Sequence, residues 1–211
     1  MKKRNTEIVI WAVLLIPFIT AFILWDKLPN QLSVHINRNT IPGKLEAILG
    51  LPGINLLIYL VIVSILKLAI DKNQLSFFEI RISMIRLAVH SCLSALFLII
   101  LFYTLNNNMN VFILLAYTFL ITILVVGNYF NAIKPNRFFG IRLPWTMSSE
   151  TVWRKTHFIT ARLWVFSSLI MMLVIPFLPQ LLIVTLFVIY IILILLTPII
   201  YSFIISKQQS A

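Results

Sequence analysis

Few side chains in this 211-residue chain could perform acid–base or metal chemistry, and they are scattered. The histidines are His35, His90 and His157, and the six acids stand at positions 7, 26, 46, 71, 79 and 150. Long apolar runs separate the histidines, so they do not predict a joint metal site. The sequence contains no HExxH, no GxSxG and no phosphate-cradling glycine loop. We therefore expect no enzyme, no metal and no cofactor.

Several other polar residues lie in or near apolar runs. Arg86 and His90 are one helical turn apart in one run, and Arg162 lies near the start of another. Such groups are functional candidates by default, because lipid solvates them poorly. In the alternative interpretation, the arginines extend to lipid head groups and the polar residues only bind neighbouring helices. The sequence leaves both interpretations open.

The composition sets the elements that must position these residues. Hydrophobic residues make up 61% of the chain, and the mean hydropathy is +1.01. A spanning helix needs roughly 20 apolar residues. Six runs qualify, at about 8–25, 51–70, 84–105, 111–133, 158–178 and 181–205. We predict an all-α polytopic membrane protein, a bundle of six transmembrane helices forming one membrane domain over 1–211, with an uncleaved first helix. The single cysteine, Cys92, excludes an intramolecular disulfide.

The basic residues predict the orientation of the chain. With the N-terminus inside, Lys27, Arg38 and Lys44 are outside, and the other 14 of the 17 basic residues are inside. This asymmetry predicts that both termini are cytoplasmic. The net charge of +11 fits anionic lipids as partners better than direct binding to nucleic acid. No residue pattern indicates an oligomeric state.

Three longer polar segments connect the predicted spans. Residues 26–50 are predicted to form a small extracytoplasmic cap, in which Leu32, Val34 and Ile36 alternate with polar residues as in a strand, and 44–49 form a helical turn. In the alternative, this segment only braces the bundle. Residues 71–83 are predicted to be a cytoplasmic interfacial helix. Residues 134–157 form a cytoplasmic loop.

The loop 134–157 is rich in residues that break regular structure. Pro135 and Asn136 favour a turn, Gly140 permits unusual backbone angles, and Pro144 disfavours helix at the residue before it. Ser148 is the predicted N-cap of a helix that begins near Ser149 and continues into the fifth span. We expect Arg142 to pair with a carboxylate or with helix-end carbonyls. Trp145, Trp153 and Trp164 suit the membrane interface.

The same stretch resembles the SdpI family, the membrane immunity proteins of the sporulation-delaying-protein toxin system. The pattern GN-(x)7-PN-xx-GIR-x-PWT, followed by S-xx-(T/V)-W-xx-TH, falls on Gly127, Asn128, Asn136, Gly140, Ile141, Arg142, Pro144, Trp145, Thr146, Trp153, Thr156 and His157. The outer segment also resembles the family's N-terminal module through Leu28, Pro29, His35, Asn37 and Pro42. Departures from that module include Ser33, Ile36 and Thr40, where the family has Pro, Phe and Gly.

The resemblance implies a function and partners. It implies a protein of the bacterial cytoplasmic membrane that protects the cell against a secreted peptide toxin. It also implies a cytoplasmic transcriptional repressor, held at the membrane, as a second partner. Because a secreted peptide arrives from outside, we expect it to bind the outer segment, through Leu32, Val34, His35, Ile36 and Asn37. The alternative function is a transporter of small molecules or a lipid-handling protein.

Overall fold

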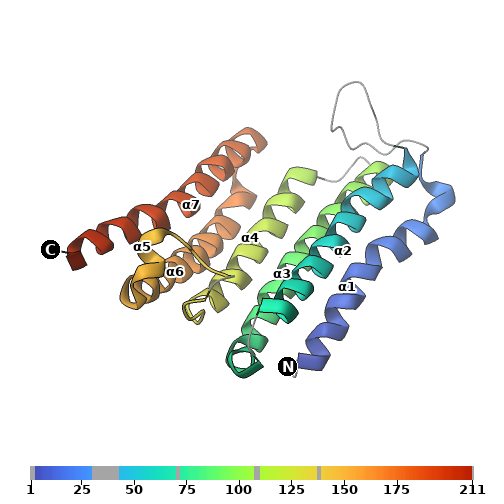
Figure 1. Cartoon of the computed structure of the whole chain (residues 1–211). Coiled ribbons are helices and arrows are strands. Elements are labelled where there is room, and N and C mark those ends of the chain that lie inside the picture. Colours follow the sequence, from blue (N-terminus) through green and yellow to red (C-terminus); the bar gives the residue numbers. More distant parts are fainter. Residues whose placement is uncertain (1–2, 30–42, 70–71, 107–109, 137–138, 211) are drawn as a thin grey trace. The chain divides into compact units, whose positions relative to one another are not determined.

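The computed structural model describes residues 3–29, 43–69, 72–106, 110–136 and 139–210 (Figure 1). The described residues form α1 (Lys3–Ile23), η1 (Trp25–Lys27), α2 (Lys44–Ala69), α3 (Lys72–Leu105), α4 (Val111–Phe130), α5 (Pro144–Ser148), α6 (Glu150–Val174), η2 (Ile175–Phe177) and α7 (Gln180–Ser210). All except α5 and the two 3₁₀ turns are long and apolar enough to cross a membrane, which gives six candidate spans. Helices suit lipid because they satisfy every backbone polar group internally. The prediction of an all-α polytopic membrane protein is confirmed.

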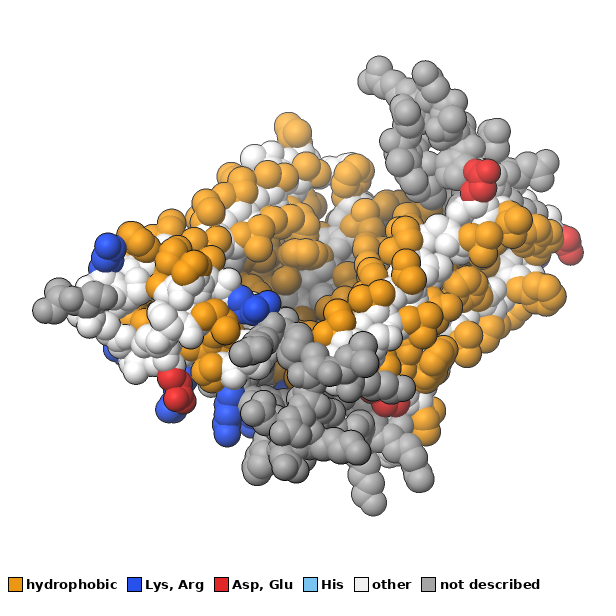
Figure 2. Space-filling model, viewed as in Figure 1, with side chains coloured by type: hydrophobic (Ala, Val, Ile, Leu, Met, Phe, Trp, Pro, Cys, Tyr) orange, Lys and Arg blue, Asp and Glu red, His pale blue; other side chains and the backbone are white. Residues whose placement is uncertain are grey.

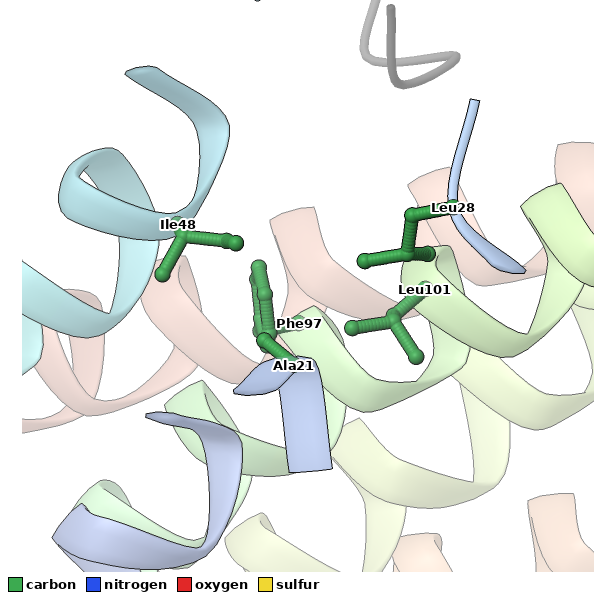
Figure 3. Packing of buried hydrophobic residues seen from close by; sticks show 5 residues of the cluster. All are labelled: Ala21, Leu28, Ile48, Phe97 and Leu101. Atoms are coloured by element: carbon green, nitrogen blue, oxygen red, sulfur yellow. The ribbon is translucent and has the colours of Figure 1, made fainter. Parts of the chain in front are cut away.

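The chain divides into two compact units, Met1–Thr118 and Phe119–Ala211. In the first unit, α1, α2 and α3 pack together. One apolar cluster joins Ala21, Leu28, Ile48, Phe97 and Leu101, and Figure 3 shows these side chains converging from the three helices and from the segment after η1. Many other large apolar side chains point outward, as expected where the solvent is lipid.

The polar segments beside α2 and α3 are described in part. The predicted helical turn at 44–49 is the first part of α2, and the Gly43 N–H donates to Glu46 Oε2 at 3.1 Å, which satisfies a backbone donor at the helix start. Leu32, Val34, His35, Ile36 and Asn37 lie outside the described residues. In α3, one continuous helix joins the described part of the predicted interfacial segment 71–83 to the third span.

The second unit contains the rest of α4 together with α5, α6 and α7. The turn η2, which contains Pro176, separates α6 from α7, and these two helices form an antiparallel pair (Figure 1). Trp164 Nε1 of α6 donates to the Ile194 carbonyl of α7 at 3.1 Å, and Ser168 Oγ lies 2.9 Å from Tyr190 Oη. Because α6 and α7 are antiparallel, the start of α6 lies beside the end of α7.

Candidate functional site

The loop between α4 and α6 is folded by its own side chains. Asn136 closes the first turn: its Oδ1 accepts from the Phe139 N–H at 2.7 Å, and its Nδ2 donates to the carbonyls of Lys134 and Phe139 at 2.9 and 3.0 Å. One asparagine thus satisfies three backbone groups that no helix could satisfy here. This arrangement explains why an asparagine, rather than a larger polar residue, follows Pro135.

Gly140 lies where the loop passes over α6. Its φ is +119°, in the region that favours glycine. A Cβ at this position would lie 2.5 Å from His157 Nε2 and 2.8 Å from the Trp153 ring. Both the backbone angle and the close approach therefore require glycine.

His157 of α6 receives the loop. Its Nε2 accepts from the Ile141 N–H at 3.1 Å, and its Nδ1 lies 2.8 Å from the Trp153 carbonyl. The neutral imidazole with its proton on Nδ1 satisfies both bonds. The ring is fully buried between Trp153, with ring centroids 4.1 Å apart, and Phe130 of α4 at 4.8 Å. His157 therefore holds the loop in place and is not exposed to a substrate.

Thr146 fixes the next part of the loop. Its Oγ1 donates to the Ile141 carbonyl at 2.7 Å and accepts from the Leu143 N–H at 2.8 Å. Leu143 is extended, with φ −105° and ψ 155°, as the proline after it predicts. Pro144 itself begins α5, because a missing N–H costs nothing in the first helical turn. The short helix α5 was not predicted from the sequence.

Each of the two tryptophans of the motif donates its indole N–H to a partner within the second unit. Trp145 Nε1 donates to Ser202 Oγ of α7 at 2.9 Å, and Trp153 Nε1 donates to the Ile133 carbonyl at 2.8 Å. Trp153 has no exposed surface. The Trp153 indole therefore packs inside the protein, where its N–H finds a partner, and its depth in the membrane stays a prediction.

The start of α6 differs by one residue from the prediction. Ser149, not Ser148, is the N-cap, and its Oγ accepts from the Val152 N–H at 3.3 Å. Ser148 instead ends α5 and donates to the Trp145 carbonyl.

Two further motif residues lie in the packing of α6. Thr156 is fully buried on α6. Gly127 allows α4 to approach α6, since a Cβ at Gly127 would lie 3.0 Å from Trp164 Cβ.

Three motif residues are exposed and are not part of this packing: Asn128, Arg142 and Pro144. Asn136, Gly140 and Ile141 are at least partly covered. Among the described residues, no carboxylate or carbonyl pairs with the Arg142 guanidinium. The expected pairing of Arg142 is therefore not found. The hydrogen bonds near it are made by the backbone groups of Ile141 and Leu143, and not by the Arg142 side chain.

The first unit contains a separate polar cluster. Arg86 of α3 binds Glu7 of α1 through two bonds, Nη1 to Oε1 at 2.8 Å and Nη2 to Oε2 at 3.2 Å. Tyr59 of α2 donates to Glu7 Oε2 at 3.1 Å. The Arg86 side chain is only 6% exposed. Arg86 therefore pairs inside the unit, and the alternative in which it extends to head groups is wrong.

One turn along α3, His90 continues the same cluster. Its Nδ1 lies 2.7 Å from Asn55 Oδ1, while Asn55 Nδ2 donates to the His90 carbonyl and to Ser94 Oγ at 3.2 and 3.1 Å. Ser94 Oγ donates to the Val13 carbonyl of α1 at 2.9 Å. Since Asn55 Oδ1 can only accept, His90 carries a proton on Nδ1. The cluster links α1, α2 and α3.

Arg162, the third intramembrane polar candidate, is not part of either arrangement. It is exposed, and its guanidinium carbon lies 4.0 Å from the centroid of the Phe158 ring, one turn earlier on α6. This geometry fits the interpretation in which an arginine on the outer face of a span extends towards head groups.

Sequence reasoning missed Glu7, Asn55, Tyr59 and Ser94 as partners. One signal was available: Asn55 is a lone amide within a strongly apolar run. Another was the similar depth of Glu7 and Arg86, since each lies within the first turns of a span that starts on the predicted inner side. Within the described residues, no group of three His, Cys, Asp or Glu residues could hold a metal ion.

Six apolar helices and one folded polar loop define a polytopic membrane protein whose longest described connection is structured. The model of the SdpI/YfhL protein family matches residues 132–202, which include most of that loop. The chain is also 27% identical over 157 residues to "Immunity protein SdpI" of Bacillus subtilis (strain 168), which covers 73% of this chain and 72% of that protein. Both findings confirm the relationship to the SdpI family. No solved structure matches the chain.

Proposed function

We propose that this chain is a membrane immunity protein that protects a bacterial cell against a secreted peptide toxin. The observation that carries the proposal is the similarity to "Immunity protein SdpI", which extends over almost three quarters of both chains. The similarity therefore includes more than the motif loop. The six candidate spans support a place in the cytoplasmic membrane, where a toxin that attacks the membrane would act.

A survival assay tests this function. The chain is expressed in a Bacillus subtilis strain that lacks its own SdpI, and the cells are exposed to the sporulation-delaying-protein toxin. A second arm deletes the gene in its native host and measures survival in that host's own spent medium. We expect protection in at least one arm, with the Gly140→Ala variant as the inactive control. Equal survival with and without the chain in both arms would contradict the proposal.

The orientation of the chain follows from its charges. We propose that both termini and the 134–157 loop face the cytoplasm, because 14 of the 17 basic residues then lie inside. Single cysteines in a Cys92→Ser background test this. A membrane-impermeant thiol reagent applied to intact cells should label Asn108→Cys and leave Ser148→Cys, an exposed position, unlabelled. Labelling of Ser148→Cys from outside would refute the orientation.

In this orientation, we propose that the outer segment 26–50 receives the toxin. The other predicted outer connections contain only a few residues, so this segment offers the largest surface to a peptide from outside. Replacing residues 30–43 by a Gly/Ser linker should abolish protection while the protein still reaches the membrane in normal amount. A scrambled version of the same 14 residues serves as the control for composition. Full protection with the linker would exclude this segment as the toxin site.

A further inference from the structure

The side chain of Arg142 is exposed in the middle of a rigidly held loop. On one side, both backbone polar groups of Ile141 are bonded, its N–H to His157 and its carbonyl to Thr146. On the other side, the Leu143 N–H is bonded to Thr146, and Pro144 begins α5. The backbone at Arg142 is therefore fixed from both sides, while no residue that the structure describes pairs with its exposed guanidinium.

Other exposed basic residues lie at the same end of the second unit. Ser149, the N-cap of α6, donates to Gln209 near the end of α7 at 2.9 Å, so the start of α6 and the end of α7 are adjacent. Arg154 and Lys155 lie in the first turns of α6, and Lys207 lies in the last turn of α7. We call the exposed side chains of Arg142, Arg154, Lys155 and Lys207 the basic end.

The segment that follows Arg142 packs against α7. Trp145, three residues after Arg142, packs edge-on against Phe203 with ring centroids 5.3 Å apart. The ammonium of Lys207 lies 5.7 Å from the centroid of the same Phe203 ring. In the space-filling view, Lys and Arg side chains are spread over the part of this unit that carries α5 and the end of α7 (Figure 2).

The charge at this end is not balanced within the unit. Residues 119–211 contain seven basic residues and one acid, Glu150. Because α6 and α7 are candidate spans whose ends meet here, the basic end lies at the boundary between the apolar layer and water. The groups that fill this boundary are phospholipid head groups. Their phosphates match the planar fork of an arginine through paired N–H···O bonds.

We propose that Arg142 is the anchor of a binding site for the phosphate of an anionic phospholipid, with the other residues of the basic end supplying attraction at longer range. The loop presents Arg142 in a fixed position, so binding loses less conformational freedom than it would for an arginine on a mobile segment. This site does not depend on the immunity function, and the lipid would bind whether or not a toxin is present.

A lipid titration of the purified full-length chain in detergent tests the site. Binding of phosphatidylglycerol is measured by native mass spectrometry and compared with that of phosphatidylethanolamine. Arg142→Gln and Arg154→Gln remove the same charge from the same end, so they form a matched pair. We expect Arg154→Gln to weaken phosphatidylglycerol binding about fivefold, the effect of one charge near a membrane surface. Arg142→Gln should weaken it at least about tenfold, because charged hydrogen bonds are lost as well.

Arg142→Lys separates geometry from charge, since it keeps the cation and loses the fork; we expect binding between those of wild type and Arg142→Gln. Equal weakening by Arg142→Gln and Arg154→Gln would overturn the site, as would equal binding of phosphatidylethanolamine. Displacement of the lipid by inorganic phosphate at the same concentration would show that free phosphate is the ligand and would also overturn it. Misfolding of both Arg142 variants would contradict the proposal too, because it would reveal a structural partner for this side chain.

Discussion

In the first unit, polar side chains bond to one another across three helices, whereas in the second unit three polar side chains of the motif bond to the backbone of one loop. Glu7, Tyr59 and Arg86 come from α1, α2 and α3, and each satisfies another side chain. Asn136, Thr146 and His157 instead satisfy N–H and C=O groups of residues close to Gly140 and Ile141.

This difference reflects what each unit must satisfy. Helices in lipid have no free backbone groups in their interior, so polar side chains there can be satisfied only by other side chains or by helix carbonyls. A loop that breaks at Pro135, Gly140 and Pro144 has many free backbone groups, and side chains from α5 and α6 bind them. Loss of one residue should therefore leave a buried charge in the first unit and unpaired backbone groups in the second.

The largest effect is expected for Gly140→Ala. Its φ of +119° and the approach of His157 and Trp153 leave no space for a Cβ. We expect a loss of about 4 kcal/mol in the free energy of unfolding, from backbone strain and overpacking together. Titration of the purified protein with a denaturing detergent measures it. Gly53→Ala in α2 is the control, because nothing lies within 4 Å of its Cβ. Similar stability of the Gly140→Ala and Gly53→Ala variants would show that the close packing at Gly140 does not stabilise the second unit.

A slightly smaller loss is expected for Glu7→Gln in the other unit. The substitution leaves the Arg86 guanidinium buried without its carboxylate, which costs about 3 kcal/mol. The same detergent titration applies. Because the cost comes from the unpaired charge, the double variant Glu7→Gln/Arg86→Met should recover at least half of the loss. If the double variant is less stable than Glu7→Gln alone, the charge pair is not what holds these helices.

His157→Phe tests the backbone bond of the loop. Phenylalanine keeps the stack between Trp153 and Phe130 but cannot accept from the Ile141 N–H. We expect a loss of about 1–2 kcal/mol, the cost of one unsatisfied donor. Limited proteolysis of the 134–149 segment should also become faster, since one attachment of the loop is lost. Lys155→Gln, an exposed neighbour, should change neither measurement. Unchanged proteolysis in His157→Phe would show that the loop does not depend on this bond.

The smallest effect on stability is expected for Arg142→Gln. This side chain is exposed and has no partner among the described residues, so the change should stay within about 0.5 kcal/mol in lipid-free detergent. Thermal unfolding of wild type and variant, side by side, measures it. A loss above about 1 kcal/mol would mean that Arg142 supports the loop, and the contrast between inward and outward motif residues would fail.

Part of the loop's structure could be read from the sequence. Pro135 and Asn136 predicted a turn, Pro144 predicted an extended Leu143, and the helix start near Ser149 was correct because serine caps and breakers act on their immediate neighbours. The direction of side chains was less predictable. Trp153 was expected at an interface and is fully buried, since only the path of Ile133 and Gly140 over α6 decides what covers it.

The sequence by itself determined six spans, because an apolar run of about 20 residues has one stable form in lipid, and a structured loop, because its breakers are local. The tertiary structure alone decided which polar groups meet. Glu7 and Arg86 are 79 residues apart, and the pairing of the helices that carry them is what brings the carboxylate and the guanidinium to 2.8 Å. The tertiary structure also decided that Arg142 is exposed. The direction of the chain at Arg142 is set by the backbone bonds of its neighbours, one of which joins the Ile141 N–H to His157, 16 residues away.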